Sequence, residues 1–437
     1  MGLALLFQYN PLAAQPATAY FSTIHFMESP FEDFKGVVPL TRSQAANRNH
    51  YRFDYDEKNR LSRIGFYTGT RLRDPNFTAN FFYLSAAIQF SYETGKEIRT
   101  FYNRFGEQIP VRGPVFREIY ELDSMGRRKS LYFENRSGGK TQNSWNIASY
   151  KWAIQTDGSV IEERFNLQGT AMPMRTDQIF HRIKMHFDQN GMMVLMQNIG
   201  GDGSLLENNS GAAQDKLVFD NNRKYYGWTV LDKNHLPKEG NAPNVARGVN
   251  EPNEYGYYAK SYHLDKNGKR MPASYGYWGT GVEYDNKGNQ SLVYFLDSLG
   301  NPGPHIREGL TYMRYSYDKA GINQVLTEFL DIDKKPFHHP MGGYASQKSS
   351  YDKKNRVIRV DYFGTDGKLI NRSADGIAST LFEYDNRNRT TRIAHYNAEG
   401  KPENQRGSGV AWITFTFEDD TKPPAIKRFN KDGNQLK

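Results

Sequence analysis

The chain has 437 residues, with 57 Lys and Arg against 48 Asp and Glu, which gives a formal net charge of +9. It contains no cysteine, so disulfides, thiolate metal sites and cysteine nucleophiles are excluded. Its mean hydropathy of −0.77 argues against helical membrane spans, and its aromatic content of 14% supplies enough apolar surface for a core. The length alone suggests two to four domains, but an internal repeat changes that interpretation.

Residues 1–19 resemble the end of a secretory signal peptide. A short apolar run at residues 3–7 precedes a stretch of small residues, in which Ala17 and Ala19 have the spacing of a cleavage site. The run lacks the basic residues that normally open a signal, so it could instead be a buried N-terminal strand. We favour the signal, which predicts export to the periplasm or the cell surface.

Residues 20–50 lie before the repeats and contain enough large apolar side chains to be buried, among them Phe21, Ile24 and Phe26. An array of repeats needs its first edge protected from water and from pairing with other chains. We therefore predict an N-terminal cap at residues 20–50.

Residues 51–437 form a repeat array with a period of about 33 residues. The repeat is recognised by an aromatic residue followed by an acid, and weaker copies of this pair continue in the same phase toward residue 55. In the C-terminal half the pairs are Tyr284-Asp285, Tyr317-Asp318, Tyr351-Asp352, Tyr384-Asp385 and Phe417-Glu418.

Each unit is predicted to form a β-hairpin. The acid of the pair should begin a type I-like turn, and the Gly or Asn three residues later should take the left-handed conformation, as at Asp285 and Gly288. The strands alternate apolar and polar residues with a period near two, as in residues 357–362. We therefore predict an all-β fold of tandem antiparallel β-hairpin repeats, which form a continuous twisted meander or a solenoid-like array.

A glycine recurs eight residues before the aromatic-acid pair. We expect it to mark a positive φ or a close backbone approach where the chain re-enters the sheet. These structural repeat glycines are Gly211, Gly276, Gly309, Gly343, Gly376 and Gly409.

The hairpin motifs resemble the tyrosine-aspartate repeats of bacterial Rhs-like proteins. The resemblance rests on residues 284–289, 351–356 and 384–389, which read YDNKGN, YDKKNR and YDNRNR. It covers most of the chain, with an atypical period of about 33 residues against about 21 in the typical repeat. The resemblance implies an envelope or surface location and a binding or scaffolding role.

Five aromatic residues near the middle of the array are candidate ligand contacts. Exposed aromatic rings stack on sugars, although any one of these rings could equally serve the core. They are Tyr257, Tyr258, Tyr275, Tyr277 and Trp278.

The sequence indicates no catalytic, metal or cofactor site. Most of the repeated carboxylates, such as Asp352 and Asp385, occupy turn positions, which explains them without catalysis. The histidines lack metal-ligand spacing, and no nucleophile-elbow or phosphate-loop motif occurs. The basic residues are interleaved with acids, so we do not favour nucleic acid as a partner.

These observations predict an exported, non-enzymatic repeat protein that acts as a binding or scaffolding subunit in a bacterial cell-envelope or surface assembly. Its expected partner is an envelope or outer-membrane protein, with polysaccharide as a further possibility. A carbohydrate-binding surface protein is the second hypothesis. A hydrolase with acidic residues on its return loops is the third.

Overall fold

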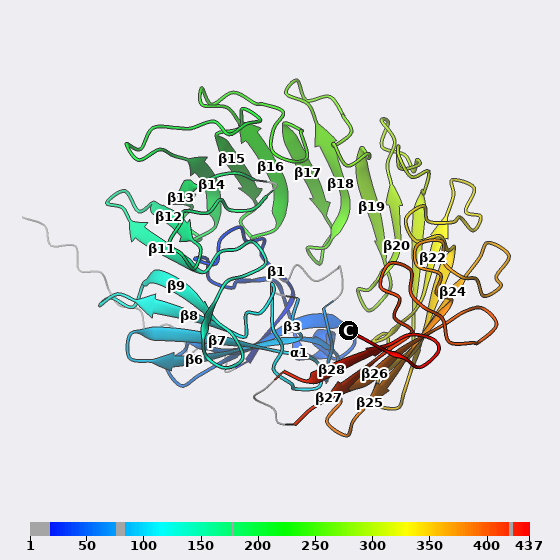
Figure 1. The fold of residues 1–437 in the computed structure, drawn as a ribbon. Helices are drawn as coiled ribbons and strands as arrows, with labels where there is room; N and C mark the ends of the chain where they lie inside the picture. The colour runs from blue at the N-terminus through cyan, green and yellow to red at the C-terminus, as the bar shows by residue number, and fades with distance from the viewer. Residues whose placement is uncertain (1–17, 76–83, 177, 419–422) are drawn as a thin grey trace, which may run out of the picture.

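The computed structural model describes residues 18–75, 84–176, 178–418 and 423–437 (Figure 1). Most of the predicted signal therefore lies outside the described residues, and Thr18 and Ala19 already belong to the first strand. The 29 strands found in the described ranges form one antiparallel sheet, which confirms the predicted all-β fold. No helix in these ranges is both long enough and apolar enough to cross a membrane.

The elements in chain order are β1 (Thr18–Ile24), β2 (Gly36–Leu40), α1 (Arg42–Ala45), β3 (Asn49–Tyr55), β4 (Leu61–Thr68), β5 (Arg71–Leu72), β6 (Ala87–Glu93), β7 (Lys96–Tyr102), β8 (Arg117–Leu122), β9 (Arg128–Glu134), β10 (Lys140–Thr141), β11 (Ser149–Ile154), β12 (Val160–Phe165), β13 (Arg182–Phe187), β14 (Met193–Asn198), β15 (Gln214–Phe219), β16 (Tyr225–Leu231), β17 (Arg247–Pro252), β18 (Tyr258–Leu264), β19 (Gly279–Tyr284), β20 (Gln290–Phe295), β21 (Tyr312–Tyr317), β22 (Gln324–Leu330), β23 (Ser346–Tyr351), β24 (Val357–Phe363), β25 (Ser379–Tyr384), β26 (Thr390–Tyr396), β27 (Trp412–Thr416), β28 (Ala425–Phe429) and β29 (Gln435–Leu436).

The strands follow one another through the sheet in chain order. β1 lies between β2 and β3, and from β3 onward each long strand pairs with the next. The two-residue strands β5 and β10 fold back on β4 and β9. Among the described strands, none of the pairings joins the two ends of the sheet, so the meander is open.

Each unit contains one hairpin, a turn at its tip and a longer return loop. In the β25–β26 hairpin, the Asp385 Oδ1 atom accepts hydrogen bonds from the backbone amides of Arg387 and Arg389, both at 2.9 Å. Asn388 closes the turn at a φ of 64°. The carboxylate and the left-handed residue thus have the roles that the repeat motif predicts.

Successive units are joined by fewer ladder pairs than the two strands within a hairpin. β25 and β26 are paired at six positions, whereas β24 and β25 are paired only between residues 359–361 and 379–381. The tyrosine of the repeat extends this short contact, because the Tyr384 hydroxyl donates to the carbonyl of Val357 at 2.7 Å. Equivalent hydrogen bonds of 2.8–2.9 Å join Tyr92 to Leu61, Tyr284 to Tyr258 and Tyr351 to Gln324.

Arginines at the turns also link neighbouring units. Arg356 forms an ion pair with Asp352 of its own turn at 2.6 Å. Its guanidinium lies 4.7 Å from the ring centre of Tyr384 in the next unit, a cation–π contact. Arg60 over Tyr92 and Arg389 over Phe417 repeat the arrangement at 4.0 and 4.2 Å. These turn arginines therefore have intramolecular partners.

The six repeat glycines all have a positive φ, between 69° and 103°. In the return loop before β25, the amide of Gly376 donates to the carbonyl of Arg372 at 2.8 Å, at a φ of 81°. This backbone conformation is difficult for any residue with a β-carbon, especially a β-branched one. The glycines therefore close the loop that leads into the next hairpin.

The array winds into a spiral that passes over its own beginning (Figure 1). The Asn49 side chain donates to Asn289 Oδ1 at 2.8 Å across 240 residues of sequence. Arg104 donates to Asn323 Oδ1 in the following hairpin turn at 3.0 Å. One turn of the spiral therefore spans about 240 residues, and its second turn rests on the first.

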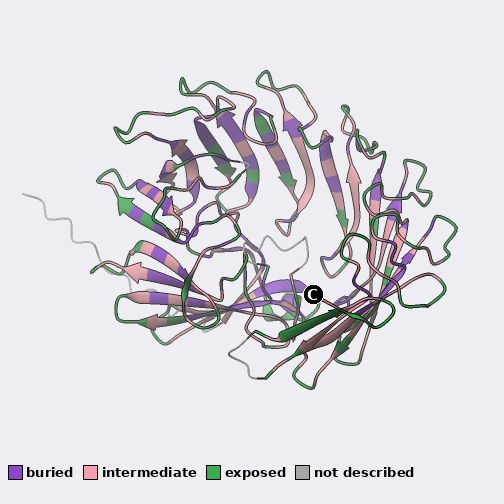
Figure 2. Cartoon of the chain, viewed as in Figure 1, coloured by how far each residue is buried: buried purple, intermediate pink, exposed green. Residues whose placement is uncertain are grey.

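The N-terminal segment, residues 18–40, runs through the concave side of the first half of the array. The hydrophobic cluster around it contains buried residues between positions 24 and 230, and buried bands are most frequent on the strands of that half (Figure 2). Four aromatic side chains of the segment contact aromatic residues on β3, β6, β11 and β16. The pairs are Phe21–Phe53, Phe34–Phe90, Phe31–Trp152 and Phe26–Tyr225.

Replacing Gly376 by Val should destabilise the array by about 1–3 kcal/mol, because a β-branched residue is strained at this φ. The measurement is the midpoint of urea unfolding followed by circular dichroism. Lys353→Ala, a change at an exposed turn residue, should leave the midpoint nearly unchanged. Equal losses for the two variants would contradict the role assigned to the glycine.

Candidate functional site

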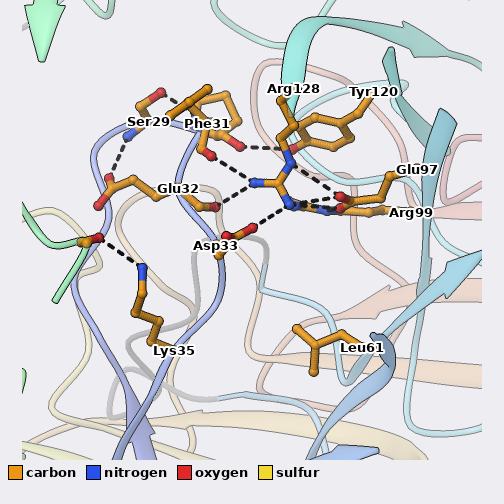
Figure 3. A network of polar contacts seen from close by, with 12 residues as sticks. Ser29, Phe31, Glu32, Asp33, Lys35, Leu61, Glu97, Arg99, Tyr120 and Arg128 are labelled. Carbon is orange, nitrogen blue, oxygen red and sulfur yellow. Dashed lines mark hydrogen bonds and ion pairs between the residues drawn. The ribbon is translucent and has the colours of Figure 1, made fainter. Parts of the chain in front are cut away.

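A buried polar network fixes the N-terminal segment to the concave side of the sheet (Figure 3). Arg128, at the start of β9, donates to the carbonyls of Phe31 and Glu32 at 2.8 and 3.1 Å. The same guanidinium forms ion pairs with Asp33 at 2.8 Å and with Glu97 at 2.9 Å. One arginine of the sheet therefore holds three consecutive residues of the segment.

Glu97 and Arg99 complete this network from β7. Arg99 pairs with Glu97 at 2.7 Å and its side chain is only 1% exposed. Burial acts to raise the pKa of Glu97, but the guanidinium groups of Arg99 and Arg128 outweigh it and lower the pKa to about 2. Glu97 is therefore charged throughout the neutral range and, together with Asp33 and Glu118, balances the two arginines.

Further contacts along the segment continue this attachment. The Tyr120 hydroxyl donates to the carbonyl of Pro30 at 3.2 Å, and Lys35 Nζ donates to the carbonyl of Gly191 at 2.9 Å. At the other end of the segment, the Tyr257 hydroxyl donates to the carbonyl of Ser22 at 3.3 Å. The segment therefore contacts strands and turns from β7 to the loop before β18.

The same concave rows continue into the second half of the array, where their residues are less buried. In the first half the row holds Phe53, Ile64 and Phe90, none more than 6% exposed. In the second half the equivalent positions are half-buried or exposed. We define the open concave face by these residues: Val282, Val293, Tyr315, Val360, Phe382, Ile393, Phe415 and Ile426.

The opposite, convex face of these strands carries charged pairs. Arg314 pairs with Glu328 at 2.7 Å across β21 and β22, and Arg392 pairs with Glu383 at 3.0 Å across β25 and β26. Exposed pairs of this kind contribute little stability but keep a surface well hydrated. The convex face thus mixes charged pairs with apolar side chains such as Leu292 and Leu381, whereas the concave positions named above carry no charge.

The five predicted ligand-contact aromatics fall into two groups. Tyr257 is buried, and Tyr258 packs against the hydrophobic cluster. Tyr275 and Tyr277 lie together on the return loop before β19, with ring centres 6.2 Å apart, and Trp278 beside them is half-buried. Tyr275 is the most exposed of the five, at 44%.

The ring of Tyr277 packs against three other rings near the return loops. Its ring centre lies 5.5 Å from those of His263 and Phe295, and 5.9 Å from that of His305. This packing places one face of Tyr277 against neighbouring units. No group of three or more His, Asp or Glu side chains in the described residues could hold a metal ion.

The polar network was missed by reading the sequence alone, although one signal was available. Along β7, Glu97 and Arg99 share the inward face with Phe101, so charges interrupt an otherwise apolar row. Charged side chains at inward positions are costly unless they are paired. These two charged residues therefore indicated a buried partner. The alternating pattern of the strand does not identify residues 30–33 as that partner.

No protein-family model matches the chain, and no curated protein matches it. Among solved structures, the TcdB2-TccC3-TEV crystal structure is similar over 90% of this chain, with 9% identity and a TM-score of 0.35; this chain spans about a fifth, 20%, of that one. A porin-like protein from Bacteroides uniformis is similar over 71% of this chain and 94% of its own, with 10% identity and a TM-score of 0.20. Both scores are too low to support a functional argument, so function is inferred from the chain's own residues.

Acid should weaken the attachment of the N-terminal segment through Glu97. Because the folded pKa, about 2, is below the ordinary value of 4.5, the ion pairs stabilise the fold above that value and lose this contribution as the pH falls toward 2. Glu97→Gln should therefore remove about 2 kcal/mol of the stability that is lost between pH 6 and pH 3. The measurement is the free energy of unfolding near pH 6 and near pH 3.

The matched control is Asp333→Asn, at a carboxylate whose side chain is 67% exposed. This variant should keep the acid sensitivity of the unchanged protein. If Glu97→Gln also kept it, the network would not be the acid-sensitive link.

Proposed function

We propose that this chain is an exported, non-enzymatic repeat protein that binds or scaffolds a protein partner in a bacterial envelope or surface assembly. The observation that carries this proposal is the open concave face. The same sheet is covered by an extended segment of the chain in its first half and has half-buried, mainly apolar rows in its second, with Thr327 and Ser349 among them. An exposed contiguous apolar surface is a common mark of a protein interaction site.

The expected occupant is a polypeptide with apolar side chains. In the first half the covering segment reaches the sheet through phenylalanine rings and main-chain carbonyls, as Phe34 and the carbonyl of Phe31 show. The open concave face continues the same rows with Tyr315, Phe382 and their neighbours. A partner that presents the same chemistry would extend the existing packing along the spiral.

Two further observations support a role without catalysis at the envelope. The turn carboxylates Asp352 and Asp385 are engaged with backbone amides and with the arginines of their own turns. The signal-like residues 1–19 and the tyrosine-aspartate motifs are consistent with an exported protein.

Photo-crosslinking on isolated envelopes tests this proposal. A benzoylphenylalanine introduced in place of Phe382 or Tyr315 should give one discrete adduct on irradiation, identified by mass spectrometry as an envelope protein. The matched control is the same group in place of Tyr294, whose ring packs over Gly281 on the convex face. Absence of an adduct at both concave positions, or equal adducts from both faces, would overturn the proposal.

A further inference from the structure

We propose that a cavity of about 250 Å³ between the N-terminal segment and strands β15 and β16 binds a single uncharged sugar ring. Phe26 of the segment and Leu217, Tyr225 and Trp228 of the two strands form its apolar lining. The volume is below the roughly 300–1,000 Å³ of sites that hold drug-sized molecules, so it suits a ligand of one ring. The site lies in the first half of the array, away from the open concave face.

At this cavity, Asp215 departs from the apolar pattern of the inward row. It occupies the inward row that holds the fully buried Tyr51, Ile88 and Ile183 in other units. A second carboxylate in this row, Glu118 of β8, lies beside Arg99. Asp215 is itself only 7% exposed. A carboxylate at a core position lowers stability unless polar groups surround it, and such exceptions to the pattern are expected at functional sites.

Planar polar side chains surround Asp215 and hold it in place. Asn241 Nδ2 lies 3.3 Å from both carboxylate oxygens, and the Gln178 amide donates to Oδ2. Gln178 in turn accepts a hydrogen bond from Arg175 at 2.9 Å, and Arg175 pairs with Glu28 of the N-terminal segment. The wall thus offers carboxylate acceptors, amide donors and a guanidinium in one connected chain.

The hydroxyl groups of a sugar both donate and accept hydrogen bonds, and neighbouring hydroxyls can be bound in pairs by planar side chains. A carboxylate has lone pairs for several donors, and the Gln178 amide nitrogen, which donates one hydrogen to Asp215, has a second one for a hydroxyl. A wall with only donors would favour an anion. The mixture of hydrogen-bond donors and acceptors around Asp215 therefore suits an uncharged polyol.

The opposite wall provides the apolar surface that a sugar ring needs. The rings of Phe26 and Tyr225 are stacked, with centres 4.1 Å apart and planes 2° from parallel. The Trp228 indole lies over Gly248, where an added β-carbon would fall 2.1 Å from the ring. This close approach fixes the indole against the next strand. Because Phe26 and Tyr225 cover each other's facing sides, the Trp228 indole is the ring that we expect to meet the C–H face of the sugar.

The charges of the lining argue against ionic ligands of either common type. Two carboxylates, Glu28 and Asp215, line the cavity, and its one arginine is ion-paired with Glu28, which disfavours a phosphate or carboxylate ligand. An organic cation among the rings is the remaining rival. A quaternary cation has no hydrogen to donate to the carboxylate oxygens of Asp215, whereas the hydroxyls of a sugar have, so we favour the sugar.

The test is saturation-transfer NMR on the full chain with millimolar methyl glycosides of glucose, galactose, mannose and N-acetylglucosamine, and with tetramethylammonium as the cationic rival. At least one glycoside should receive saturation. Trp228→Leu and Asp215→Asn should each weaken that signal by about tenfold. Trp412→Leu, the same change at a half-buried tryptophan far along the array, should leave it intact.

No transfer to any glycoside, transfer that survives in both cavity variants, or binding of tetramethylammonium alone would overturn the assignment. Thermal unfolding of each variant establishes that a lost signal is not lost folding. This inference stands apart from the proposed function, because the crosslinking test probes different strands and a different kind of ligand.

Discussion

The sheet depends on the contacts between consecutive units, and in four of them a tyrosine hydroxyl makes that contact. A lone hairpin is at best marginally stable in water, so every hairpin must take stability from its neighbours. The main-chain ladder between units is short, and the hydroxyl of Tyr384 extends it to the carbonyl of Val357. The arginine of the preceding turn then covers the same ring. The acid, the arginine and the tyrosine together form one contact between neighbouring units, which explains why they recur together.

The N-terminal segment gives two halves of one sheet different environments. In the first half the concave face is a true core, with inward charges neutralised by Arg128 and its partners. In the second half the same backbone geometry persists with half-buried apolar rows. Hairpin geometry is therefore set within each unit and by its neighbours, while burial is set by what lies against the concave side. That separation allows a repeat array to keep its shape while its inner surface serves for binding.

The hairpins, their turns and the left-handed residues were predictable from sequence, because each depends on a few adjacent residues. Asp385 and Asn388 specify their turn through local hydrogen bonds and backbone preference. The winding was not predictable, since it arises from small twists summed over many units. The polar cavity was also missed, because Gln178, Asp215 and Asn241 come from different units and no local pattern relates them.

The spiral contact between its two turns has a consequence for how such a chain can change. Asn49 meets Asn289, and Arg104 meets Asn323, only because a fixed number of units separates them. Gain or loss of one internal unit would shift the second turn by about 33 residues against the first, and both contacts would face the wrong partners. The spiral therefore requires a fixed number of units per turn. The contacts made by the second turn constrain the number of units in the first.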